Sequence, residues 1–256
     1  MRALVTGAGG RLGAAMATEL ARLGYDVAVH YASSVAGAQA TAEAVEAVGR
    51  RAATLRADLL DLEACDALVG RAADALGGPL NVLVNNASIF EYDTIKTATH
   101  DSWDRHFGSN LRAPLILTQA FAAQAPEPGS DGEPLATGCI VNMIDQRVRK
   151  LTPEFMTYTL AKAGLWTLTQ TTAQALAPAI RVNAIGPGPT LQGARQSSKQ
   201  FAAQRAATVL ERGADVDDIV AALRYILSAK SLTGQLICVD GGQHLGWQTP
   251  DILGVE

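Results

Sequence analysis

The chain has 256 residues, and its 25 acidic residues outnumber its 21 lysines and arginines to give a formal net charge of −4. This balance and an aromatic content of 5% argue against a nucleic-acid-binding protein, which needs a basic surface and stacking side chains. The three cysteines form no CxxC pair, so neither a disulfide framework nor a metal site is expected. With no secretory signal and no run near the roughly 18 apolar residues of a membrane span, we expect a cytoplasmic protein without a membrane partner.

Short apolar runs alternate with longer stretches rich in alanine and leucine. The runs are continuous, which predicts strands covered on both faces, and the strand–helix rhythm predicts parallel crossovers. We therefore expect an α/β fold, a single Rossmann-like domain over residues 1–256 with a doubly wound parallel sheet and helices on both faces. The expected strands are 3–5, 27–29, 53–55, 80–84, 139–141, 181–184 and 236–239, and the expected helices lie near 11–23, 35–49, 61–77, 101–125, 154–177 and 215–229.

Local signals mark the ends of several of these elements. Asp61 can cap the helix that follows it, and Gly24 and Gly49 stand where helices should stop. The stretch 125–138 is rich in proline and glycine. It predicts a surface loop rather than a domain linker, because strand-like sequence resumes directly after it.

A glycine-rich turn follows the first expected strand and reads TGAGGRLG from Thr6 to Gly13. Such a turn lets the backbone approach a pyrophosphate, whose charge the first N–H groups of the next helix stabilise. The same pattern also suits a plain strand-to-helix connection, but its place after the first strand of an alternating chain favours dinucleotide binding. Arg11 adds a guanidinium that can contact a phosphate or an anionic substrate.

The end of the second expected strand indicates which cofactor binds. An NAD site places a carboxylate there for the ribose hydroxyls, and that carboxylate would repel the extra phosphate of NADP. Here the strand leaves through His30, Tyr31, Ala32, Ser33 and Ser34, and the nearby Asp26 lies at the opposite end of the strand. The sequence therefore favours NADP(H), with the two serines as phosphate ligands or as an ordinary turn, although this turn has no basic residue to hold the phosphate.

Further motifs follow in a fixed order along the chain. They are Thr6-Gly7 to Gly13, Asp58-Leu59, Asn85-Asn86-Ala87, Asn110, Tyr158 to Lys162, Pro187-Gly188 and Asp240-Gly241-Gly242. With this set the chain resembles the short-chain dehydrogenase/reductase family over essentially its whole length. The resemblance implies a nicotinamide cofactor, a small-molecule substrate and a homodimer or homotetramer.

The resemblance also implies residue roles. Asp58 and Leu59 would lie near the adenine, Asn86 and Ala87 beside the cofactor ribose, Asn110 in a proton relay, and Tyr158 with Lys162 at the catalytic centre. The expected cofactor-binding residues are Gly7, Arg11, Leu12, Gly13, His30, Tyr31, Ser33, Ser34, Asp58, Leu59, Asn86, Ala87, Ser88, Lys162, Pro187 and Gly188.

Tyr158 and Lys162 are 162 − 158 = 4 residues apart, so both side chains lie on one face of the expected helix. An ammonium beside a phenol favours the phenolate, and we expect it to lower the tyrosine pKa from about 10. A pair with this spacing is more often a surface pair, but the surrounding motifs favour proton transfer.

Asp145 stands 158 − 145 = 13 residues before Tyr158, where the family generally has its catalytic serine. An ionised carboxylate can only accept hydrogen bonds. At about 4 Å it would oppose a developing alkoxide by roughly 4 kcal/mol at an effective dielectric near 20, or about three orders of magnitude in rate. We therefore expect a substrate with N–H donors or an imine nitrogen, as in a pteridine. The carboxylate should also raise the tyrosine pKa and keep Tyr158 available as an acid.

Arg11 in the cofactor turn and Asp145 in place of serine together make the chain resemble pteridine reductases and bacterial dihydromonapterin reductases. That resemblance implies that Phe90 stacks on one face of a flat heterocycle with the nicotinamide on the other, although Phe90 could also be an ordinary packing residue. It implies further that Arg11 and Ser88 bind pterin or cofactor phosphate, and that Asp145, Tyr158 and Lys162 transfer the proton. The expected substrate residues are thus Arg11, Ser88, Phe90, Asp145 and Tyr158.

Two segments are left with open roles. Residues 189–212 should form a substrate lid. Gln243, His244 and Trp247 follow the Asp240-Gly241-Gly242 motif and either reach a neighbouring subunit or form an exposed tail.

The sequence as a whole predicts an NADPH-dependent oxidoreductase that reduces a C=N bond of a pterin-like heterocycle. An NADP-dependent carbonyl or 3-oxoacyl reductase, with Asp145 neutral or turned away, is the first alternative. A non-catalytic NADP-binding sensor is the second, and the intact pair of Tyr158 and Lys162 argues against it.

Overall fold

The computed structural model describes residues 1–193 and 195–249, so residue 194 of the expected lid and residues 250–256 of the expected domain lie outside the described part. Seven parallel strands form one sheet in the order β3-β2-β1-β4-β7-β8-β9. Their bounds are β1 (Arg2–Val5), β2 (Asp26–Tyr31), β3 (Ala52–Arg56), β4 (Val82–Asn85), β7 (Gly138–Met143), β8 (Ile180–Pro187) and β9 (Leu236–Val239).

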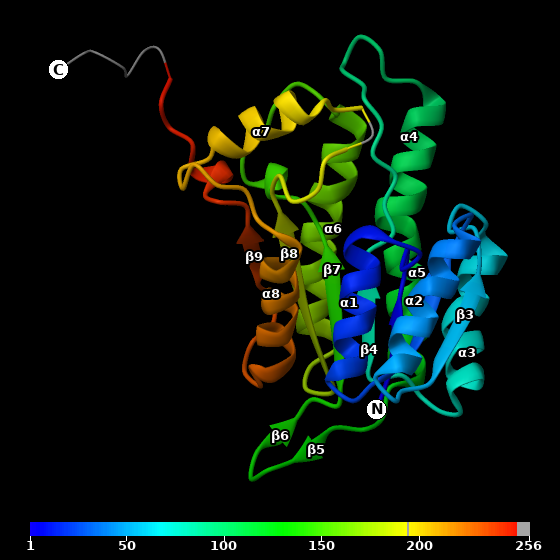
Figure 1. Ribbon diagram of the computed structural model, residues 1–256. Helices are drawn as coiled ribbons and strands as arrows, with labels where there is room; N and C mark the ends of the chain where they lie inside the picture. The colour runs from blue at the N-terminus through cyan, green and yellow to red at the C-terminus, as the bar shows by residue number, and fades with distance from the viewer. Residues whose placement is uncertain (194, 250–256) are drawn as a thin grey trace.

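Helices cover both faces of this sheet (Figure 1). The helices α1 (Arg11–Arg22), α2 (Val35–Ala47) and α8 (Val216–Ser228) pack on one face. On the other face lie α3 (Leu62–Leu76), α5 (Ala113–Gln124) and α6 (Met156–Ala175). All six residues of β7 are buried, as expected of a strand covered on both sides. The expected doubly wound α/β fold is thus confirmed.

Three expectations about local structure need correction. The helix expected at 101–125 is interrupted: α4 (His100–Phe107) runs through a π-helical turn, η1 (Gly108–Arg112), into α5. The expected loop at 125–138 contains a hairpin of β5 (Gly129–Ser130) and β6 (Pro134–Leu135), and the lid contains α7 (Ser198–Ala206). Figure 1 shows the hairpin and α7 at opposite ends of the sheet. The hairpin strands have two residues each and α7 is short and polar, so neither produces a periodic apolar pattern in the sequence.

The expected helix ends agree with the structure. Asp61 caps α3 by accepting hydrogen bonds from the backbone N–H groups of Glu63 and Ala64 at 3.0 and 3.2 Å. Gly24 and Gly49 follow α1 and α2 with φ of +91° and +79°, a conformation that glycine adopts without strain. Across residues 1–193 and 195–249, no helix combines the length and apolar character needed to cross a membrane.

The order of the strands places a crevice at one edge of the sheet. The chain passes from β1 outward to β2 and β3, then returns to place β4 on the other side of β1. In open α/β sheets, ligands bind outside the carboxyl ends of the strands at such a reversal. Helix α1 begins at this point, directly after the glycine-rich turn.

Candidate active site

A cavity of about 400 Å³ lies at the carboxyl ends of β1, β2 and β4. Among the expected cofactor-binding residues, it brings together Gly7, Arg11, Leu12, Gly13, His30, Asp58, Leu59, Asn86, Ala87 and Ser88. Tyr31 ends β2, and Ser33 and Ser34 lie on the connection from β2 to α2; all three are outside this lining. Pro187 and Gly188, at the end of β8, line a second cavity described below.

The glycine-rich turn fits closely against the end of β4. Gly7 has φ of +62°, and a Cβ there would lie 2.9 Å from the Cα of Ala87. A Cβ on Gly13 would overlap the Gly7 carbonyl oxygen and lie 2.6 Å from Asn86 Nδ2. That Nδ2 donates hydrogen bonds to the carbonyl oxygens of Thr6 and Gly7 at 2.9 and 3.2 Å. Both glycines are therefore required by the shape of the turn.

The start of α1 suits a phosphate group. Its N-cap is Gly10, which provides no side-chain cap, and its first turn contains no acidic residue. The first N–H groups of the helix and its positive dipole end are therefore available to an anion. With Arg11 beside them, the residues present fit the pyrophosphate of a dinucleotide.

His30 supports this turn from within. Its Nδ1 accepts a hydrogen bond from the Gly7 N–H at 3.0 Å, and its Nε2 then donates to the Ala57 carbonyl at 3.1 Å. Burial lowers the His30 pKa to about 4, so the ring is neutral near pH 7. His30 thus shapes the cofactor turn and carries no charge toward a phosphate.

A second cavity, of about 860 Å³, shares Arg11, Leu12 and Ser88 with the first. Asp145, which follows β7, and Phe90, which follows β4, line this second cavity. The Tyr158 hydroxyl of α6 donates a hydrogen bond to Asp145 Oδ2 at 3.0 Å. The structure therefore joins the expected acid and carboxylate at the wall of a cavity that adjoins the cofactor cradle.

Burial sets the proton affinities of this pair. It raises the pKa of Tyr158 well above the usual value of about 10, and the Asp145 carboxylate adds to the shift while the Ser88 hydroxyl opposes it. Burial also raises the pKa of Asp145, although the N–H of Arg147 donates to its Oδ1 at 2.8 Å. The net shift is upward, as expected from Asp145 and opposite to the lowering expected from Lys162; Arg147 and Ser88 are the groups that oppose it. Tyr158 is a protonated acid near neutral pH.

Lys162 lies beneath the tyrosine and is almost fully buried. Its Nζ donates a hydrogen bond to the Met143 carbonyl at 2.7 Å and lies 5.7 Å from the centre of the Tyr158 ring. Burial lowers its pKa to about 8, and the nearby Asp145 charge opposes that shift. The ammonium is thus held in place by the end of β7.

This lysine predicts an alkaline limit to cofactor use. Above pH 8 its side chain becomes neutral, so kcat/KM for NADPH should fall with an apparent pKa near 8 in initial-rate measurements. A fall in kcat/KM that begins only above pH 10 would contradict the assignment of this limit to Lys162. The lowered pKa also means that the unfolded chain binds more protons between about pH 8 and 10.4. The contribution of Lys162 to stability should therefore rise with pH across that window.

Asn110 does not present a free amide to the site. It is fully buried in the π-helical turn, where its Oδ1 accepts from the Ile89 N–H at 2.9 Å and its Nδ2 donates to the Ile89 carbonyl at 2.8 Å. The side chain therefore holds the segment that carries Ser88 and Phe90. This is a positioning task in addition to the expected place in a proton relay.

Phe155 and Arg195 are site residues that sequence reasoning missed. The Phe155 ring stacks on Phe90 with centroids 4.4 Å apart, and its backbone has φ of +54°, a strained value for a bulky residue. Arg195 donates to the Phe90 carbonyl at 2.7 Å, and its Cζ lies 5.4 Å from the Phe90 ring centre. One face of Phe90 is thus packed against Phe155, and the expected stacking of Phe90 on a heterocycle stays a prediction. Phe155 is the N-cap residue of α6 and lies outside the regular helix, so helical spacing from Tyr158 did not reveal it.

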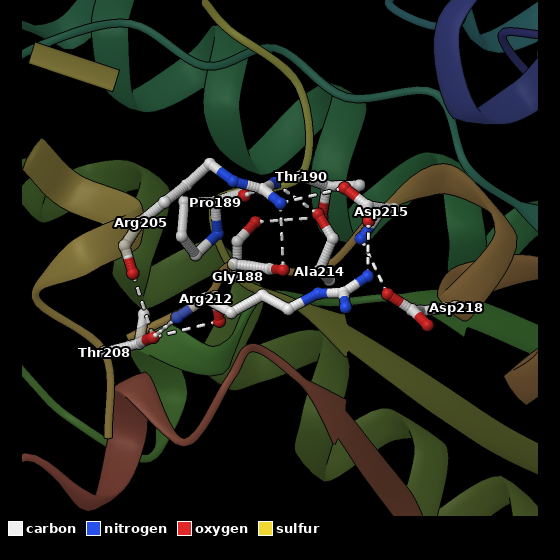
Figure 2. Close-up of polar contacts among 10 residues, drawn as sticks. Gly188, Pro189, Thr190, Arg205, Thr208, Arg212, Ala214, Asp215 and Asp218 are labelled. Atoms are coloured by element: carbon white, nitrogen blue, oxygen red, sulfur yellow. Dashed lines mark hydrogen bonds and ion pairs between the residues drawn. The ribbon is translucent and has the colours of Figure 1, made fainter. Parts of the chain in front are cut away.

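The lid is anchored at its base by Arg205 of α7, as Figure 2 shows. The guanidinium donates to the carbonyl oxygens of Pro189, Gly213 and Ala214 at 3.0, 3.1 and 2.6 Å, and it pairs with Asp215 at 2.8 Å. Near the start of the lid, Arg11 donates to the carbonyls of Leu191 and Gln192, both at 3.3 Å. Together with Arg195, which bonds to Phe90, these arginines connect the lid to the rest of the site.

Replacing Arg205 with alanine removes the bonds to all three carbonyls. We expect a rise of about 10-fold in KM for the substrate, which corresponds to the loss of about one charged hydrogen bond, and faster tryptic cleavage of the lid. Steady-state kinetics and limited proteolysis measure both. The matched control is Lys199→Ala on the exposed surface of α7, which should change neither KM nor the cleavage of other lid sites.

The residues after β9 have separate environments. Gln243 lines the second cavity. His244 bonds to Asp240 Oδ2 through its backbone N–H at 2.8 Å and through Nδ1 at 2.7 Å. Trp247 is 57% exposed, which agrees with either of the roles left open for the tail.

Comparison with known proteins places this site in a family. The family described as enoyl-(acyl carrier protein) reductase matches residues 7–244. L-rhamnose 1-dehydrogenase (NAD(P)(+)) of Sphingomonas sp. is 32% identical, with 96% of each chain covered. The 3-oxoacyl-[acyl-carrier-protein] reductase FabG of Staphylococcus aureus is 31% identical over 95% of this chain and 98% of its own. The chain belongs to the short-chain dehydrogenase/reductase family of oxidoreductases, as its motifs predict.

Within this family, the solved structures similar to this chain include alternative dihydrofolate reductases. The crystal structure of FolM alternative dihydrofolate reductase 1 from Brucella canis, in complex with NADP, has a TM-score of 0.90 and 43% sequence identity. The match covers 98% of this chain and 96% of that chain. The relatives thus share the fold and the redox class, while their names differ in substrate.

Proposed function

We propose that the protein is an NADPH-dependent reductase that reduces a C=N bond of a pterin-like heterocycle. The observation that carries this proposal is the hydrogen bond from Tyr158 to Asp145 at the wall of an aromatic cavity. The bound NADP of the FolM structure supports the cofactor assignment. NADPH supplies the hydride when it is bound.

The protein's own groups hold the cofactor and deliver the proton. The N-terminus of α1 and Arg11 bind the pyrophosphate, and the Lys162 ammonium binds a ribose hydroxyl of the nicotinamide half. As the ring carbon accepts the hydride, the adjacent ring nitrogen needs a proton, which the neutral Tyr158 hydroxyl provides. The resulting phenolate is then reprotonated from solvent.

Asp145 gives the site its preference. An ionised carboxylate accepts hydrogen bonds from the N–H and amino groups of a pterin, which a ketone lacks. Phe90 and Phe155 provide a flat apolar wall for the ring system. Arg11 and Ser88 line both cavities, so they can contact the substrate and the cofactor together.

Carbonyl reduction is the second candidate, and one observation favours it. Burial raises the pKa of Asp145, and a protonated carboxyl could donate a hydrogen bond to a carbonyl oxygen as the family's serine does. FabG among the relatives supports this alternative.

NADPH oxidation with substrate panels separates the two candidates. One panel holds 7,8-dihydropterins and dihydrofolate, and the other holds ketones and 3-oxoacyl thioesters. We expect turnover of the dihydropterins with kcat/KM at least about 100-fold above any ketone, since the charged carboxylate opposes an alkoxide. Efficient ketone turnover without any pterin turnover would overturn the pterin proposal in favour of the carbonyl reductase.

A further inference from the structure

We propose that Arg56, at the carboxyl end of β3, binds the 2′-phosphate of NADP(H) and sets the preference for NADP(H) over NAD(H). The inference rests on the cofactor part of the proposed function and is independent of the pterin substrate. The connection between β2 and α2 contains no lysine or arginine. In this proposal, Arg56 of the neighbouring strand β3 provides the positive charge instead.

Two of the groups expected near this phosphate, Ser34 and His30, are already committed to other bonds. A phosphate monoester has a charge near −2 at neutral pH and needs hydrogen-bond donors and positive charge. The Ser34 hydroxyl donates its proton to the Gly9 carbonyl at 3.0 Å. His30 is buried, neutral and bonded through both ring nitrogens. Neither side chain provides a cation.

Arg56 lies beside the connection between β2 and α2, where the adenosine ribose of the cofactor is expected to bind. It pairs in register with Tyr31, the last residue of β2, and its Nε donates to the Ala32 carbonyl at 3.3 Å. Ala32 lines the cofactor cavity. Because the cofactor's adenosine ribose is recognised at the end of the second strand, the guanidinium lies where a 2′-phosphate would be placed.

The side chain of Arg56 is also directed away from the core. Its neighbours Leu55 and Ala57 are buried against α3, so the alternation of a strand turns Arg56 to the opposite face, where α2 packs. Arg56 itself is exposed. A guanidinium whose Nε is fixed presents the paired N–H groups of its two terminal nitrogens, the geometry that suits a phosphate.

The surrounding charges favour an anion at this position. Arg71 of α3 places a second cation near the carboxyl end of β3, where its Nη1 donates to the Arg56 carbonyl at 3.1 Å. The nearest acid of the cavity lining is Asp58, whose Oδ1 accepts the Leu60 N–H at 3.0 Å. Arg11 is bonded to the lid carbonyls and lies at the pyrophosphate end, so it does not substitute for Arg56.

The test is direct ligand binding by isothermal titration calorimetry with wild-type protein and Arg56→Gln. The probes are 2′,5′-ADP and 5′-AMP, then NADP⁺ and NAD⁺, so that each pair differs only by the 2′-phosphate. Arg56→Gln should weaken 2′,5′-ADP and NADP⁺ by about 10- to 100-fold, the range for hydrogen bonds to a charged group. The affinity for 5′-AMP and NAD⁺ should change less than about twofold. Arg56→Lys should have affinities for 2′,5′-ADP and NADP⁺ between those of the wild type and Arg56→Gln, because lysine keeps the charge but lacks the paired N–H donors of arginine.

Arg22→Gln is the matched control. It removes the same charge from the exposed last turn of α1, at the far end of that helix from the cofactor turn, and should leave all four affinities unchanged. A pH series adds a second readout. The second phosphate pKa is near 6, so the wild-type preference for 2′,5′-ADP should shrink between about pH 7 and 5, and Arg56→Gln should show a flatter profile.

Two results would overturn the assignment. One is an unchanged affinity of Arg56→Gln for 2′,5′-ADP. The other is an equal loss for both members of each pair, which would mean that Arg56 only supports the fold. Wild-type protein that binds neither NADP⁺ nor 2′,5′-ADP would overturn the cofactor proposal and this inference together. Failure with pterins alone would overturn only the substrate.

Discussion

Replacing Tyr158 with phenylalanine is expected to lower kcat for the preferred substrate by about 100- to 10,000-fold, the range for loss of a general acid. The hydroxyl is the group that donates to Asp145 Oδ2, and its raised pKa keeps it protonated at neutral pH. The aromatic ring remains edge-on to Phe90, with centroids 4.6 Å apart, so the cavity wall should keep its shape. Single-turnover kinetics and NADPH titration measure chemistry and cofactor binding separately.

Tyr92→Phe is the matched control for this variant. Tyr92 also lines the second cavity, and its ring packs edge-on to Phe155 with centroids 5.1 Å apart. In the part of the chain that the structure describes, Tyr92 forms no hydrogen bond with Asp145, and it is 54% exposed, so loss of its hydroxyl should change kcat less than about threefold. A similar loss of kcat in both variants would show that the cavity needs hydroxyls in general, and it would remove the special role of Tyr158.

The pH profile of the Tyr158→Phe variant tests a related point. Because Lys162 rather than Tyr158 has its pKa near 8, the residual activity should keep the alkaline limb of the wild-type enzyme. Disappearance of that limb would assign it to the tyrosine and would mean that the phenol titrates in the physiological range after all.

Much of the fold could be predicted from the sequence because its signals are local and repeated. Continuous apolar strands, such as the fully buried β7, differ clearly from the amphipathic stretches between them. Asp61, Gly24 and Gly49 act on their own helix ends, so no tertiary information is needed to read them. The π-helical turn could not be predicted, because the Asn110 amide responds to the backbone of Ile89, 21 residues away.

The site shows the same division. Tyr158 and Lys162 have the spacing of one helical turn, and Asp145 precedes Tyr158 by a fixed 13 residues. The proton-transfer residues could therefore be predicted from the linear sequence. The Phe155 ring is different, because its position depends on a left-handed backbone conformation at the start of α6. Arg56 and Arg195 act on segments that are distant in sequence: they bond to Ala32, 24 residues away, and to Phe90, 105 residues away. Contacts of this kind appear only when strand order and lid placement are known.

Replacing Asp145 with serine is expected to exchange the substrate preference. The carboxylate is the acceptor that pterin N–H groups would use, so the variant should lose about 10- to 100-fold in kcat/KM for dihydropterins. Simple ketones should gain on the order of 10- to 1000-fold, because a hydroxyl can donate to the developing alkoxide that a carboxylate repels. The measurement is kcat/KM for both panels with the two proteins side by side. A variant that loses ketone activity as well would contradict the proposed role of the charge.

Asp145→Asn separates charge from shape, and the stability of both variants gives an independent check. Burial raises the Asp145 pKa, so the folded chain binds more protons than the unfolded chain as pH rises from the usual aspartate value of about 4. The contribution of this carboxyl to stability is therefore present at low pH and is lost as pH rises through its folded pKa. Both neutral variants should melt at a higher temperature than the wild type at pH 7, and this advantage should disappear below about pH 4. Equal melting temperatures at pH 7 would mean that the Arg147 N–H and the Tyr158 hydroxyl fully offset the cost of burying the charge, and the raised pKa would then be wrong.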